Sequence, residues 1–105
     1  MRKAMRRVLE MEGFATEGFD AAEEFLTSGC VSRAHCLVLD LHLPGMSGIE
    51  LHEHLREAGN AMPTVFVTAH EDARTRRLVA DGANCLIKPF PGEALLQAVS
   101  RSIAR

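Results

Sequence analysis

Residues 36–40 read Cys-Leu-Val-Leu-Asp, and residues 64–68 read Thr-Val-Phe-Val-Thr. Each stretch is a short and nearly unbroken apolar run, which is typical of a strand buried on both faces of a parallel sheet. A third run, residues 83–87, is closed by Lys88 and Pro89. These runs predict three strands, and the rest of the fold is arranged around them.

Amphipathic helices are predicted around these strands, because apolar residues recur there at intervals of three and four. Two of the helices begin with a predicted capping box, which runs from Asp20 to Glu23 in one and from Ser47 to Glu50 in the other. Residues 14–19 could form a further short strand. The predicted helices cover residues 1–12, a short stretch after Asp20, the stretch from Ser47 to Gly59, residues 72–80 and residues 93–103.

Strands that alternate with helices predict an α/β fold with a doubly wound parallel sheet. Ligands of such sheets bind outside the carboxyl ends of the strands. Three polar side chains fall at those ends, namely Asp40, Thr68 and Lys88. A carboxylate can accept a phosphoryl group, a lysine can neutralise phosphoryl oxygens, and a threonine hydroxyl can donate a hydrogen bond to one of them. The three side chains therefore predict a phosphoryl-transfer site.

The composition narrows the class of protein. The chain has 105 residues, 47% of them hydrophobic and 25% charged, which is enough for one domain with its own core. A net charge of −2 and the absence of Trp and Tyr argue against direct nucleic-acid binding. We find neither a membrane span nor a signal-peptide pattern. Three cysteines without a CxxC spacing indicate a reducing, cytoplasmic location, with no disulfide framework and no zinc site.

The order and spacing of the motifs resemble the receiver domain of bacterial two-component response regulators. The motifs are residues 36–48, 64–69 and 88–90, and the resemblance is strongest to the nitrogen-fixation, LuxR-type branch. It covers essentially the whole chain, so residues 1–105 are expected to be one receiver domain. The implied fold is flavodoxin-like.

The resemblance implies a role for each residue of the predicted site. Asp40 would accept a phosphoryl group from a sensor histidine kinase, and Thr68 and Lys88 would contact that group. The Lys88–Pro89 peptide bond would be cis, as X-Pro bonds allow. Mg²⁺ would be held by Asp40 and by the backbone carbonyl of His42.

The sequence departs from the family pattern at its start. Receivers begin with a hydrophobic strand that ends in two or three acidic residues, and these residues hold the Mg²⁺. This sequence begins inside the following helix, so on the order of ten residues are missing relative to the family. We therefore expect weak or absent Mg²⁺ binding and impaired phosphorylation. Three explanations stay open: the sheet closes up with four strands, another chain fills the gap, or the natural product starts upstream of Met1.

A second departure lies at the expected switch. The family usually places an aromatic residue three positions before the lysine, where this chain has Cys85. Thr68 and Cys85 are thus the predicted switch residues, without the usual aromatic side chain. We expect a signalling module rather than an enzyme, in which phosphorylation alters a partner or homodimer surface formed by the last two helices and the last strand.

Two alternatives to a phosphorylation-switched receiver domain stay open. One is a degenerate receiver that works without phosphorylation as a dimerisation or protein-binding module. The other is a phosphohydrolase that uses Asp40 as its nucleophile, with His42 at the spacing of an acid–base partner.

Overall fold

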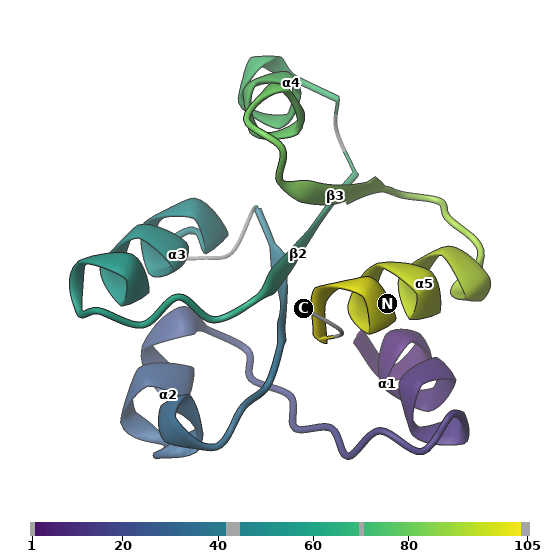
Figure 1. The fold of residues 1–105 in the computed structure, drawn as a ribbon, viewed down its shortest axis with the longest axis horizontal. Coiled ribbons are helices and arrows are strands. Elements are labelled where there is room, and N and C mark those ends of the chain that lie inside the picture. Colours follow the sequence, from purple (N-terminus) through teal and green to yellow (C-terminus); the bar gives the residue numbers. More distant parts are fainter. Residues whose placement is uncertain (1, 42–44, 70, 104–105) are drawn as a thin grey trace.

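A computed structural model of the chain describes residues 2–41, 45–69 and 71–103, and it shows an α/β fold (Figure 1). Three strands, β1 (Leu37–Asp40), β2 (Thr64–Thr68) and β3 (Asn84–Ile87), pair in parallel in the order β1-β2-β3. All three strands predicted from the apolar runs are confirmed.

Helices cover both faces of the sheet, as a doubly wound fold requires (Figure 1). On one face lie α1 (Arg2–Met11) and α5 (Gly92–Ile103). On the other lie α2 (Ala22–Thr27) and α3 (Gly48–Glu57), with a 3₁₀ turn, η1 (Cys30–Ser32), after α2. Finally, α4 (Ala73–Ala80) precedes and contacts β3. In the described parts of the chain, no helix is long and apolar enough to cross a membrane.

The core has two layers, and β2 contributes to both of them. Val65, which is fully buried, packs with Leu9 of α1 and Val99 of α5. The next residue, Phe66, is 2% exposed and packs on the opposite face with Leu51 of α3. Because successive strand side chains point to opposite faces, the unbroken apolar run of β2 fills both layers.

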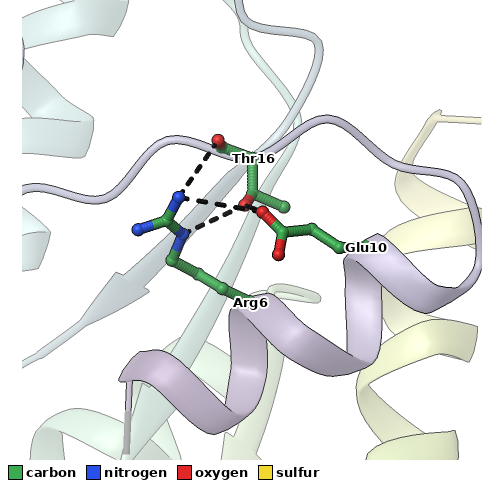
Figure 2. A network of polar contacts seen from close by, with 3 residues as sticks. All are labelled: Arg6, Glu10 and Thr16. Atoms are coloured by element: carbon green, nitrogen blue, oxygen red, sulfur yellow. Dashed lines mark hydrogen bonds and ion pairs between the residues drawn. The ribbon is translucent and has the colours of Figure 1, made fainter.

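Residues 14–19 form no strand, so the short strand considered for them is wrong. A strand needs a ladder partner, and the pairing of β1 among the described residues is with β2 alone. Side chains of α1 hold the segment instead (Figure 2). Arg6 donates through Nε to the Thr16 hydroxyl over 3.0 Å, and that hydroxyl donates to the Glu10 carboxylate. The segment is thus fixed by side-chain contacts in place of a backbone ladder.

The capping box predicted at Asp20 is also wrong. The N-cap of α2 is Ala21, which makes no side-chain capping bond. The Glu23 carboxylate turns instead toward the loop before α3, where it accepts a hydrogen bond from the backbone N–H of Met46 over 3.1 Å. The first turn of α2 therefore contacts the loop before α3 through Glu23.

The second capping box, at the start of α3, is confirmed. The Ser47 hydroxyl accepts from the backbone N–H of Glu50 over 3.2 Å, and the Glu50 carboxylate accepts from the N–H of Ser47 over 2.9 Å. These bonds lower the pKa of Glu50. They also fix the point where α3 begins, next to the carboxyl end of β1.

Replacing Ser47 with alanine is expected to reduce the free energy of unfolding by about 1 kcal/mol, because one N-terminal N–H of α3 loses its acceptor. The midpoint of urea unfolding measures the loss. Ser32→Ala is a suitable control, since the exposed Ser32 hydroxyl makes only a local bond to the Gly29 carbonyl. An equal loss of unfolding free energy in both variants would mean that the Ser47 cap stabilises the protein no more than an exposed serine does.

His52 of α3 lies edge-on to Phe66, with ring centroids 5.3 Å apart. Burial lowers the pKa of His52, the nearby Arg56 lowers it further, and Glu53 opposes both effects. The unfolded chain, with an ordinary histidine pKa near 6.5, then binds a proton more readily than the folded chain does. This contribution to stability is complete above pH 6.5 and is lost as the pH falls toward the folded pKa.

We therefore expect the unfolding midpoint in urea to fall between pH 7 and pH 5 more steeply for the unaltered protein than for His52→Gln. The substitution removes the group whose protonation opposes folding. His54→Gln on the same helix is the matched control, because His54 is exposed. Parallel pH profiles for the unaltered protein and His52→Gln would contradict the expectation.

Candidate functional site

Asp40, Thr68 and Lys88, the three residues predicted to form the phosphoryl-transfer site, lie at the carboxyl edge of the sheet. Asp40 ends β1, Thr68 ends β2, and Lys88 follows directly after β3. In the register, Asp40 lies opposite Val67 and Thr68 lies opposite Ile87. Because the strands are parallel and neighbouring, their ends meet at one place, as the sequence predicts.

Asp40 and Lys88 form the central contact of this edge. The Lys88 Nζ lies 3.1 Å from Asp40 Oδ2, across 48 residues of chain. The Asp40 side chain is 35% exposed and that of Lys88 is 16% exposed. The carboxylate is therefore open to an incoming group, and the ammonium is held beside it.

Thr68 is completely buried, which the sequence does not indicate. Its carbonyl accepts a hydrogen bond from the backbone N–H of Lys88 over 2.7 Å, so the end of β2 positions the residue after β3. The Lys88–Pro89 peptide bond is cis, as predicted. The three predicted residues are thus brought together by the strand pairing.

Gly48 is a positioning residue that the sequence analysis missed. A Cβ atom added there would lie 2.6 Å from the backbone oxygen of Asp40. Any other residue at this position would push α3 away from the end of β1. The sequence shows a glycine directly after the capping residue Ser47. Only the packing shows that a glycine is needed there, because the backbone of α3 approaches the Asp40 carbonyl closely.

The predicted switch residue Cys85 lies on β3 opposite Phe66 and is partly buried. Burial raises the pKa of the Cys85 thiol, and the Asp72 carboxylate raises it further. The side chain is therefore a neutral thiol at physiological pH. It packs against the core layer of α2 and α3.

The described residues fit a magnesium ion poorly. Asp40 supplies one carboxylate, and that carboxylate is paired with Lys88. Across residues 2–41, 45–69 and 71–103 there is no group of three His, Cys, Asp or Glu side chains that could hold a metal. His42, whose carbonyl was expected to be a ligand, lies outside the described residues. As a family, receiver domains bind Mg²⁺ at an acidic pocket, and this part of the chain provides only one of the acids.

Several curated proteins are similar to this chain in sequence. Nodulation protein W of Bradyrhizobium diazoefficiens is 35% identical over all of this chain and 47% of its own length. The transcriptional regulatory protein FixJ of Azorhizobium caulinodans is 32% identical over all of this chain and 51% of its own length. The chain spans about half the length of these two curated relatives, and 23% of the C4-dicarboxylate transport regulator DctD of Pseudomonas aeruginosa.

Solved structures agree with the sequence relatives. The response regulator StyR superposes with a TM-score of 0.87 at 42% identity, over 99% of this chain and 54% of that one. The N-terminal fragment of FixJ superposes with a TM-score of 0.83 at 30% identity, over 99% of this chain and 85% of that one. The family model of the response regulator receiver domain matches residues 1–100. The chain therefore belongs to the receiver-domain family of two-component response regulators, in the branch that contains FixJ.

Proposed function

We propose that this chain is a phosphorylation-operated switch, in which Asp40 accepts a phosphoryl group from a sensor histidine kinase. Response regulators as a class receive phosphoryl groups from such kinases, and receiver domains are signalling modules. The observation that supports the proposal best is the 3.1 Å contact between Lys88 Nζ and Asp40 Oδ2 at the open edge of the sheet. The proposal includes the assignment of residues 1–105 to one receiver domain.

The chemistry needs an attacking carboxylate and a cation beside it. A carboxylate oxygen of Asp40 attacks the phosphorus of a phosphohistidine and forms the new O–P bond, while the N–P bond breaks and the imidazole nitrogen keeps the electron pair. Negative charge grows on the phosphoryl oxygens, and Lys88 is close enough to neutralise it. In the proposal, the Thr68 hydroxyl donates to a phosphoryl oxygen after a local adjustment at the end of β2.

Magnesium would strengthen the same site by neutralising further phosphoryl charge. Mg²⁺ sites often use one or two carboxylates, with water and phosphate oxygens as the other ligands. Because the described site supplies Asp40 alone, we propose that the ion binds weakly and chiefly with the phosphodonor.

The surface that responds is proposed to lie on α4, β3 and α5. Val79 on α4 is 54% exposed and Ile87 on β3 is 37% exposed, and together with Arg76 and Glu71 they line one shallow hollow. Exposed apolar side chains ringed by charges are typical of a protein contact. We propose that a partner or a second copy docks there when Thr68 and Cys85 shift after phosphorylation.

The test is mass spectrometry of the intact chain after incubation with acetyl phosphate and Mg²⁺. We expect one added phosphoryl group on the unaltered protein and none on Asp40→Asn. Asp81→Asn, at an exposed site after α4, is the matched control and should be phosphorylated normally. No phosphoryl group on a chain that circular dichroism shows to be folded would overturn the proposal in favour of a phosphorylation-independent binding module.

A further inference from the structure

The carboxylate of Glu23, on α2, lies against the backbone just before α3. It accepts a hydrogen bond from the Met46 N–H over 3.1 Å, across 23 residues of chain. A Cβ atom added at Gly45 would lie only 3.0 Å from Glu23 Oε2. One carboxylate of α2 is therefore in contact with two consecutive backbone positions before α3.

Gly45 permits this contact in two ways. Its φ of +71° lies in the left-handed region, which glycine adopts without the steric cost that a side chain brings. It also has no Cβ atom that would crowd the Glu23 carboxylate. The contact therefore depends on the glycine as well as on the glutamate.

Both partners of this hydrogen bond are anchored in the core. Ala22 and Phe25, on either side of Glu23 in α2, are buried in the α2/α3 layer. The Met46 side chain packs against the same layer. The backbone of Met46 is therefore held from two sides, by the core and by the Glu23 carboxylate.

Met46 is connected to Asp40 by two short steps. Ser47 follows Met46 and caps α3 through its exchange of hydrogen bonds with Glu50. Gly48 comes next, and a Cβ atom added there would lie 2.6 Å from the Asp40 carbonyl oxygen. A shift of Met46 therefore moves the residue that presses on the backbone of Asp40.

We propose that Glu23 is a positioning residue for phosphoryl transfer, which keeps Asp40 aligned with the incoming phosphorus through Met46 and Gly48. The inference rests on the proposed role of Asp40 as the acceptor. A displacement of about 1 Å can lower a rate by on the order of 100-fold, even when the altered residue is far from the reacting atoms. Loss of one exposed hydrogen bond displaces the backbone less, so we expect an effect of about tenfold.

The test measures phosphorylation of the intact chain by mass spectrometry over a range of acetyl phosphate concentrations. Glu23→Ala is expected to lower the maximal rate about tenfold and to leave the half-saturating concentration unchanged, because alignment is lost and donor binding is not. Glu23→Gln keeps an oxygen that accepts from the Met46 N–H, so most of the rate should return. Glu24→Ala, at the exposed neighbouring glutamate, should react at the unaltered rate.

Two further measurements separate positioning from a general loss of stability. Amide hydrogen exchange at Met46, followed by NMR, should be about fivefold faster in Glu23→Ala, which corresponds to the loss of one ordinary hydrogen bond. Ser28→Ala weakens the other end of α2, because the Ser28 hydroxyl donates to the Phe25 carbonyl and accepts from the Cys30 N–H. This variant should be phosphorylated at the unaltered rate.

Equal rates for Glu23→Ala and Glu24→Ala would overturn the inference and leave Asp40 as the acceptor. The same holds if Ser28→Ala slows phosphorylation as much as Glu23→Ala does, or if exchange at Met46 is unchanged in Glu23→Ala. No phosphoryl group on the folded, unaltered chain would overturn the proposed function and this inference together. The failure of the inference alone is thus distinguishable from the failure of both.

Discussion

Replacing Lys88 with alanine is expected to lower the rate of phosphoryl transfer to Asp40 by on the order of 100-fold, the cost of removing one preorganised charge from a transition state. In the structure the Lys88 ammonium is 3.1 Å from the Asp40 carboxylate and only 16% exposed, so solvent screens this cation little. Without the Lys88 ammonium, no cationic side chain of the described residues forms an ion pair with Asp40, so the negative charge that grows on the phosphoryl oxygens is not neutralised. Rates are measured by intact-mass spectrometry during incubation with acetyl phosphate.

Two further variants make the result specific. Lys88→Arg keeps the charge but replaces a compact ammonium with a planar fork, so an intermediate rate is expected. Lys3→Ala removes an exposed lysine of α1 and should leave the rate unchanged. If Lys88→Ala is phosphorylated as fast as Lys3→Ala, Lys88 has no part in the transfer; that result would leave the assignment of Asp40 as the acceptor unchanged.

Phe66→Ala is expected to have the largest effect on stability, a loss of about 3–5 kcal/mol in the free energy of unfolding. Phe66 is 2% exposed at the middle of the central described strand, and it packs with Leu51 and against the ring of His52. Truncation leaves a cavity that the paired backbone of β2 cannot collapse to fill. Because domains are stable by about 5–15 kcal/mol, such a loss can unfold much of the population.

Urea unfolding followed by far-ultraviolet circular dichroism measures this loss. Phe66→Leu retains most of the buried volume and should lose much less stability. Phe19→Ala, at a partly buried ring that packs on Phe25, is a second comparison outside the sheet. A loss below about 1 kcal/mol for Phe66→Ala would mean that the α2/α3 layer is loosely packed at β2.

Most of the site could be predicted because strand ends are encoded locally. An apolar run that stops at a polar residue marks both the strand and its carboxyl end, so Asp40, Thr68 and Lys88 could be assigned to one edge before any contact was known. The need for Gly48 could not be predicted, because it arises from the approach of α3 to the Asp40 carbonyl. The burial of Thr68 could not be predicted either, because it depends on how the surrounding elements pack over the end of β2.

The class of the fold, its three parallel strands and the residues at their ends could be predicted from the sequence, because periodicity and apolar runs are local signals. The conformation of residues 14–19 and the start of α2 depend instead on contacts between segments that are distant in the sequence. A strand forms only when a neighbour completes its ladder, and residues 14–19 have side-chain supports from α1 instead. Likewise, the Glu23 carboxylate does not complete a capping box at the start of α2. It accepts a hydrogen bond from the backbone N–H of Met46, which is distant in the sequence and adjacent in the fold.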